Sequence, residues 1–424
     1  MSHFDVAAVR ARLAEKSIAG NYGIFVPIGA VLGGLGLVLF VLALMGDGSH
    51  RAWQMFHVNW LFWTALTAGS IAITAVYKIA NSKWSGVILR FSQAVSAMIP
   101  VSLLGLVVVL TVGYHDIWGH MAEELHTLAH GKALWLSRPW MSVRLAVGLV
   151  AMFAVGIALI RCDLLPDLAA VRDKVTGARK ARYDRMLQGF DAEKTLARTY
   201  RLAPVYAVTY ALVMTIIAFD AIMALQPHWF SNLFGGWFFM ASFLGGHTLL
   251  ALLMLFGVRA LGIAEYVSPR QQHDLGKMVF GFTVFWTYLM WAQFLVIWYG
   301  NMPEETGFVL SRLWGPWRPI GCNSVSTHVI SSFAVLISGG ATKTWLTLGL
   351  FTAISLAALF LERYFLVIPT ITAEAGPVVG LPEVGPTLLF AGLFFLSYAW
   401  FARTYPMVSP RLAGITLERE AGHH

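Results

Sequence analysis

Long apolar stretches separated by short polar segments dominate the sequence. A helix that crosses a bilayer needs roughly 20 mainly apolar residues. Ten stretches fit that description, at residues 22–45, 54–77, 91–113, 141–160, 203–224, 232–258, 278–300, 322–339, 344–369 and 384–402. The eighth has the weakest apolar pattern. We therefore predict an all-α integral membrane protein with ten transmembrane helices in a single domain, residues 1–424.

The composition agrees with this pattern. Hydrophobic residues make up 58% of the chain and charged residues 12%, which is outside the range of soluble proteins. The net charge of +8 resides in a few loops between apolar stretches, so it indicates topology and not nucleic-acid binding. The two cysteines, Cys162 and Cys322, form no CxxC motif. We therefore expect no iron–sulfur cluster or c-type haem held by this chain alone.

The positions of the basic residues predict the topology. Of the 30 Lys and Arg residues, 23 fall in the two tails and in alternate loops on one side. The loops of the other side hold five, namely Arg51, Lys132, Arg138, Arg312 and Arg318. Basic residues accumulate on the cytoplasmic side of membrane proteins. We therefore predict cytoplasmic tails at 1–21 and 403–424, a basic cytoplasmic loop at 161–202 and a periplasmic loop at 114–140.

Two loops invite a further hypothesis. In the basic loop, acidic residues are interspersed among the basic ones, and we predict short helices there at the level of the lipid head groups. These helices either fix the orientation of the protein in the membrane or bind a cytoplasmic partner. In the periplasmic loop, Glu123, His126 and His130 would share one face of a helix at i, i+3 and i+7. That face is either a metal-binding group or an ordinary solvated or partner-facing surface.

Ionisable residues inside the apolar stretches gather toward the periplasmic side. They are His57, Arg144, Asp220, Glu362 and Arg363. Charged groups at membrane depth face the interior of a helix bundle and pair with one another. The cluster therefore predicts either a set of ion pairs that holds helices together, or a proton-transfer or quinone-head-group site.

Further polar residues suggest a proton path from the cytoplasmic side. Tyr206 and Thr209 lie on the same helix face as Asp220, although the positions between Thr209 and Asp220 on that face are apolar. The alternative is that both hydroxyls bond to backbone carbonyls or to a packed neighbour. His247 and Gln293 are two more polar candidates within apolar stretches, and no pair of histidines suggests a b-type haem.

Four segments of the sequence resemble one known family. They are FDAIMALQPHWFSNLFGGWFF (219–239), WSGVILRF (84–91), KALWLSRPWMSVR (132–144) and WYGNMPEETGF (298–308). Together they are similar to the F subunit of bacterial alternative complex III, a membrane anchor of the NrfD/polysulfide-reductase class. The resemblance implies ten spans arranged as two four-helix bundles, from spans two to five and six to nine, with one peripheral helix at each end. By resemblance, Asp220, Arg144 and Arg363 are the expected site residues.

The resemblance also implies a function. Such complexes oxidise menaquinol or ubiquinol in the bacterial inner membrane and pass the electrons to a periplasmic acceptor. The implied partners are a sister C subunit, an iron–sulfur and molybdopterin-like B subunit, multihaem cytochrome c subunits, small membrane-anchor subunits, lipid and a terminal oxidase, with no nucleic acid. Haem c and iron–sulfur clusters belong to these partners. The resemblance associates the quinol site with the sister C subunit. For this chain it implies a scaffolding role, with a proton path or a second site for menaquinol or ubiquinol as further alternatives. We expect no net electron transfer by this chain alone.

One segment departs from the family, and other functions stay open. The stretch from Arg318 to Thr344, which includes His328, is polar at its start and short of apolar length. It is either a genuinely divergent helix or an artefact of a shifted reading frame over this stretch. Alternatives to the complex subunit are a secondary transporter and a purely structural membrane anchor. The off-centre cluster and the absence of paired Gly/Pro interruptions in matching spans speak against the transporter.

Overall fold

Long helices make up the protein, as the computed structural model shows for residues 6–20, 22–321, 344–371 and 376–421. Within these residues there is no strand, and nine helical segments are long and apolar enough to cross a membrane. They are α2 (Phe25–Leu44), α3 (Ser49–Ile79), α4 with α5 (Leu89–Thr111), α8 (Arg138–Val171), α10 (Ala192–Ala221), α11 (Phe234–Leu261), α12 (Pro269–Gly300), α16 (Trp345–Ile371) and α17 (Leu381–Thr404). The all-α membrane architecture is thereby confirmed for nine predicted stretches. The tenth, 322–339, and His328 lie outside the described residues.

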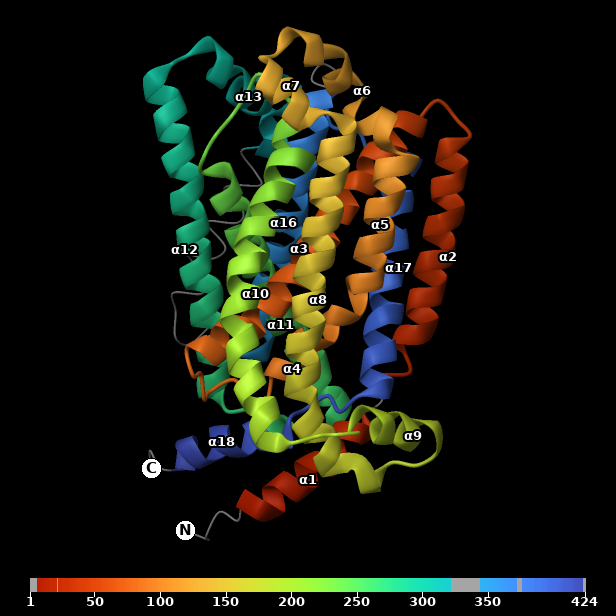
Figure 1. Ribbon diagram of the computed structural model, residues 1–424, viewed down its shortest axis with the longest axis vertical. Coiled ribbons are helices and arrows are strands. Elements are labelled where there is room, and N and C mark those ends of the chain that lie inside the picture. Colours follow the sequence, from red (N-terminus) through yellow and green to blue (C-terminus); the bar gives the residue numbers. More distant parts are fainter. Residues whose placement is uncertain (1–5, 21, 322–343, 372–375, 422–424) are drawn as a thin grey trace.

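Short helices close both ends of the bundle (Figure 1). At one end lie α1 (Val6–Ala19), α9 (Gly177–Met186) and α18 (Pro410–Ala421), together with both chain termini. We call this the terminal end. At the opposite end lie α6 (Tyr114–Glu124), α7 (His130–Leu136) and α13 (Pro303–Leu313). The two tails thus share one side of the molecule, as the predicted topology requires.

Helix α3 is the centre of the bundle. It packs against α5, α8 and α10 and also against α11, α16 and α17. In its most apolar window 89% of the residues are buried, whereas the value for α2, which packs mainly on α17 at the edge, is 17%. Polar side chains such as His57, Asn59, Thr67 and Lys78 are accordingly buried on α3. Because α3 does not face lipid, it carries polar groups that a peripheral helix could not.

Backbone contact between α3 and α11 depends on glycine. A Cβ atom added to Gly69 would lie 2.0 Å from the carbonyl oxygen of Ser242, and one added to Gly246 would lie 2.8 Å from the carbonyl carbon of Gly69. Small residues of this kind let membrane helices approach closely and gain van der Waals contact. The two central helices therefore touch through their main chains.

Two predicted boundaries differ from the structure. Helix α8 continues to Val171 and α10 begins at Ala192, so much of the predicted loop 161–202 is helical. The cause is that the acidic residues after position 160 are buried by ion pairs and do not mark the end of the helix. The predicted stretch 91–113 begins at Leu89 and contains a 3₁₀ turn, Val95–Met98. Pro100 causes this turn, since it has no N–H for the Ser96 carbonyl, which accepts from Ile99 instead.

Substitution of Gly69 tests the close contact. We expect Gly69→Ala to destabilise the fold by about 1–3 kcal/mol, because the new methyl group meets backbone atoms that no rotamer change can move. Thermal unfolding of the purified protein in detergent measures the effect. Gly34→Ala is the matched control, since a Cβ atom at Gly34 on α2 has no neighbour within 4 Å in the described structure. Equal unfolding midpoints for the two variants would show that the contact does not contribute.

Candidate functional site

Arg144 of α8 and Asp220 of α10 form a two-point ion pair toward the opposite end of the bundle. Nε of Arg144 donates to Oδ2 of Asp220 at 3.0 Å, and Nη2 donates to Oδ1 at 2.9 Å. The Asp220 side chain is 1% exposed. The Trp135 ring of α7 covers the guanidinium, whose carbon lies 3.8 Å from the ring centroid. Such a bidentate, stacked pair fixes α8 against α10.

His57 of α3 lies beside this pair. Its Nε2 is 2.7 Å from the carbonyl oxygen of Ala221, the residue after Asp220. A carbonyl oxygen only accepts, so Nε2 carries the proton. Nδ1 is buried and has no hydrogen-bond partner among the described residues. The edge of Trp118, from α6, contacts the imidazole with 5.0 Å between ring centroids, so the loop helix separates His57 from the surface.

Glu362 and Arg363 form a second ion pair, within α16. Nη1 of Arg363 donates to Oε1 of Glu362 at 2.6 Å, and both side chains are buried. The Arg363 guanidinium lies over the Phe238 ring of α11, 4.3 Å from the centroid. Since the two residues are adjacent on one helix, this pair does not join two helices by itself. The five predicted groups therefore divide into two ion pairs and a histidine that bonds to a backbone carbonyl.

A cavity of about 370 Å³ lies between α11, α12, α13 and α16, and Glu362 is on its wall. Its described lining is mainly aromatic, with Trp229, Phe234, Trp237, Trp286, Trp291, Phe294, Phe308 and Phe365. Only three side chains of that lining, Gln293, Arg312 and Glu362, can ionise or carry an amide. The indole nitrogens of Trp229 and Trp237 are buried donors without a hydrogen-bond partner among the described residues. The cavity thus presents flat apolar walls and free donors.

The segment Phe219–Phe239 builds one wall of this cavity. Helix α10 ends at Ala221, a 3₁₀ turn covers Met223–Leu225, and α11 begins at Phe234. Between them Trp229 stacks on Phe308 of α13 with 3.7 Å between centroids and an interplanar angle of 7°. The connection between α10 and α11 therefore carries a tryptophan that anchors α13.

Arg312 closes the cavity from α13. Its N–H groups donate to the carbonyls of Phe308, Phe365 and Leu366 at 2.8–3.2 Å, and also to Thr370. Pro369 lacks the N–H that would otherwise bond to the Phe365 carbonyl, so Arg312 replaces that bond. Burial lowers the pKa of Arg312 to about 9, and no carboxylate pairs with it in the described part of the chain.

The predicted proton path starts from hydroxyls that are already bonded. Tyr206 donates to the Ala68 carbonyl at 3.0 Å, and Thr209 donates to the Val205 carbonyl of its own helix at 2.7 Å. The structure thus shows the alternative geometry for both residues. No contact in the described structure links either hydroxyl to Asp220.

The two remaining polar candidates join helices. His247 of α11 has Nδ1 3.0 Å from the Phe243 carbonyl and Nε2 3.1 Å from the Tyr77 hydroxyl of α3. Gln293 of α12 accepts from the Ser231 hydroxyl at 3.0 Å. His247 is therefore a bonded core histidine, whereas Gln293 also lines the aromatic cavity.

The predicted metal-binding face does not form. Helix α6 ends at Glu124, a 3₁₀ turn follows, and extended backbone at Leu128 precedes α7, which begins at His130. Glu123, His126 and His130 therefore do not share one helix face, and that hypothesis is wrong. Across the described residues no group of three or more His, Cys, Asp or Glu side chains could hold a metal ion.

Comparison with known proteins adds no assignment. No model of a known family matches this chain, and no curated protein matches it.

A second group of buried charges lies at the terminal end, and sequence reasoning missed it. Asp163 of α8 accepts from Lys78 of α3 at 2.5 Å and from Arg411 of α18 at 3.2 Å. Gln93 of α4 donates to its other oxygen at 2.8 Å. Asp163 is 1% exposed, so three helices converge on one carboxylate.

The same network continues one helical turn along α8. Asp167 is fully buried and pairs with Arg90 of α4, and it accepts from the Ser409 hydroxyl at 2.8 Å. The available signal was the i, i+4 spacing of two acids that follow an apolar stretch. Both were assigned to the basic loop because charge normally marks the end of a span.

We predict that loss of Asp220 destabilises the protein through its partner. Asp220→Asn leaves the Arg144 guanidinium without its carboxylate and should cost about 3 kcal/mol or more. The double variant Asp220→Asn with Arg144→Gln should recover much of this loss, since no lone charge remains. Thermal unfolding in detergent compares the three proteins. A double variant as unstable as Asp220→Asn alone would contradict the ion-pair explanation.

We also predict that Asp163 holds the C-terminal helix in place. Asp163→Asn should speed amide hydrogen exchange across α18, because Arg411 loses its buried partner. Glu418→Gln is the control, since its bridge to Arg10 ties the same helix but is 43–48% exposed and contributes little. If both variants exchange alike, the buried network does not secure α18.

Proposed function

We propose that this chain is a membrane subunit of a quinol:cytochrome c oxidoreductase of the alternative complex III type. Its place would be the bacterial inner membrane, with both tails in the cytoplasm and the terminal end facing inward. The four resembling segments, the helical architecture and the clustering of basic residues at the tails and alternate loops support this proposal. The partners would be the sister anchor, the iron–sulfur subunit and the multihaem cytochromes named above.

The aromatic cavity carries the more specific part of the proposal, which is that a quinol head group binds there. Ligand pockets typically measure roughly 300–1,000 Å³ and combine apolar walls with a few polar groups. A quinol has a flat substituted ring and two oxygens. The ring would stack within the tryptophan and phenylalanine walls, and the indole N–H groups of Trp229 and Trp237 would donate to an oxygen.

Glu362 supplies the acid–base group. It is the only carboxylate of the described cavity lining, and Arg363 holds one of its oxygens at 2.6 Å. Oxidation of a quinol releases two protons and two electrons. In this proposal the Glu362 carboxylate accepts one proton from a ring oxygen, the second proton leaves to water, and the two electrons leave to a redox centre in a partner subunit. Arg363 then acts as a positioning residue that orients the carboxylate.

A second candidate function, an anchor without substrate, has its own support. The Arg144–Asp220 pair is bidentate, and the hydroxyls of Tyr206 and Thr209 are bonded to carbonyls. These residues would then serve assembly alone. The two functions differ in what they require of the aromatic cavity, because an anchor needs no ligand there.

The test begins with the protein purified gently from native membranes. We expect multihaem cytochromes and an iron–sulfur protein to accompany it, together with extractable quinone. In that complex Glu362→Gln should leave the subunits assembled but lower quinol oxidation by roughly 100-fold, the usual contribution of a positioned acid–base group. Trp229→Phe keeps an aromatic side chain, although a smaller one, and removes the N–H, so it should weaken quinone retention with a smaller effect on turnover.

Glu304→Gln serves as the control, because Glu304 is an exposed acid at the start of α13 on the same end of the protein. Unchanged turnover and quinone content in Glu362→Gln would favour the anchor. A protein that purifies without haem absorbance and without partner subunits would contradict the assignment to this complex.

A further inference from the structure

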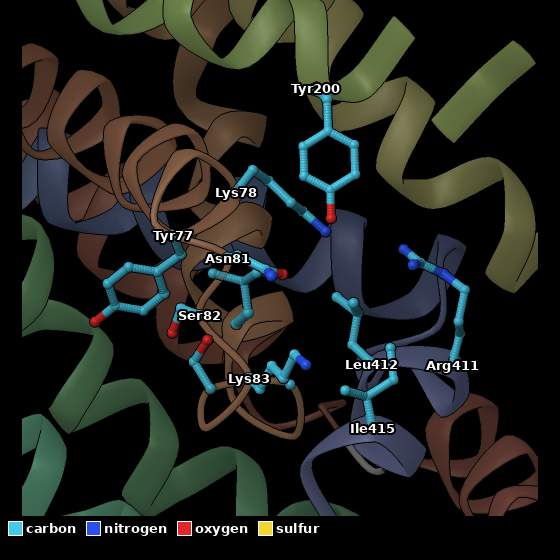
Figure 2. Close-up of a pocket in the computed structure, with 12 residues that line it drawn as sticks. Tyr77, Lys78, Asn81, Ser82, Lys83, Tyr200, Arg411, Leu412 and Ile415 are labelled. Atoms are coloured by element: carbon cyan, nitrogen blue, oxygen red, sulfur yellow. The ribbon is translucent and has the colours of Figure 1, made fainter. Parts of the chain in front are cut away.

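A small polar cavity opens at the terminal end, beside the buried charge network of Asp163 and far from the aromatic cavity (Figure 2). It lies between the end of α3, the turn that leads to α4, the first part of α10, and α18. Its volume is about 80 Å³. This volume exceeds the roughly 10–15 Å³ that a single buried water needs, so it has room for several waters or for one phosphate group.

Three cations line the cavity, and two of them share one carboxylate. Lys78 and Arg411 both pair with Asp163, at 2.5 and 3.2 Å. Lys83, from the turn after α3, has an exposed side chain and no ion pair within the described residues. The local charge is therefore positive, because Asp163 neutralises only part of the charge of the three cations. An anion in the cavity would neutralise the rest.

Polar atoms on the wall are left without partners. The Ser82 hydroxyl and Nε of Arg411 are buried and make no hydrogen bond in the described part of the structure. Figure 2 shows the Lys78 ammonium and the Tyr200 hydroxyl pointing toward the same space. Buried donors without partners are costly, and oxygens of a bound phosphate would accept from them.

The surroundings favour a phosphate that arrives on a lipid. The cavity lies where α3 and α10 leave their apolar stretches, at the level of the short helices that cross the terminal end (Figure 1). Beside it, Ile79, Leu196 and Tyr200 expose 52%, 40% and 46% of their surface. These side chains form an apolar surface on which acyl chains can lie. Basic pockets between helices at the cytoplasmic surface are known to recognise anionic head groups.

We propose that this cavity binds the phosphate of an anionic phospholipid head group. The lipid would bridge the turn after α3, through Ser82 and Lys83, to Arg411 on the C-terminal helix. Free inorganic phosphate offers the same chemistry but no contact with Ile79 or Leu196. The lipid therefore becomes a structural link between α18 and the bundle.

The experiment uses the full chain in nanodiscs of phosphatidylcholine with a fraction of phosphatidylglycerol. Native mass spectrometry then counts the phosphatidylglycerol that stays bound after release into detergent. Lys83→Ala should weaken its retention about fivefold, the effect of one basic residue near an anionic surface. Lys194→Ala, an equally conservative change at the start of α10 with an 87% exposed side chain, should have no effect. Ser82→Ala should also reduce retention without changing the charge.

Two measurements test the lipid site and distinguish a lipid from free phosphate. Equal retention of phosphatidylglycerol by Lys83→Ala, Ser82→Ala and Lys194→Ala would overturn the site. A second arm adds inorganic phosphate to the protein in pure phosphatidylcholine and measures binding by calorimetry. Phosphate binding as tight as that of the lipid would overturn the assignment to a head group. Retention of phosphatidylglycerol over phosphatidylcholine by the wild type, lost in the cavity variants, would establish it.

Discussion

The pairing of buried charges is the constraint on which this fold depends. A charge removed from water is costly unless an opposite charge and hydrogen bonds compensate it. In the described structure, an ion pair with a carboxylate compensates each of four buried basic residues, namely Lys78, Arg90, Arg144 and Arg363. Most of these pairs join different helices, so satisfying them also determines which helices are neighbours.

The two ends of the bundle use this chemistry differently. At the opposite end, Arg144 and Arg363 each form a simple pair with one carboxylate, and the space beside Glu362 is lined by aromatic rings. At the terminal end, Asp163 and Asp167 each gather several donors from helices distant in sequence. One end is therefore suited to an apolar, flat ligand and the other to an ionic one.

Much of the architecture was predictable from the sequence. The apolar stretches located nine of the long helices, because the length needed to cross a bilayer leaves little choice. Ion pairing among the in-span charges was predicted as one of two alternatives, since such charges must face the interior, but the sequence did not indicate that Arg144 pairs with Asp220. What the sequence did not reveal were partners brought together by the fold, such as Ser409 with Asp167, which are 242 residues apart.

The errors share a physical origin. Charge was taken to end a helix, yet in α8 the acids after position 160 are neutralised from the side and the helix continues to Val171. Helical periodicity was extended through MAEELHTLAH, where a break before His130 rotates the later residues out of phase. The aromatic cavity could not be foreseen, because it is made by four helices whose packing no single stretch encodes.

The network around Asp163 has a consequence for biosynthesis. Lys78, Arg90, Asp163 and Asp167 all belong to the first half of the chain, so their charges can neutralise one another while the ribosome is still making the later helices. Ser409 and Arg411 reach the same carboxylates only when translation is nearly complete. The first half can thus enter the membrane already balanced in charge, and the arrival of the last helix completes the hydrogen bonds of the finished protein.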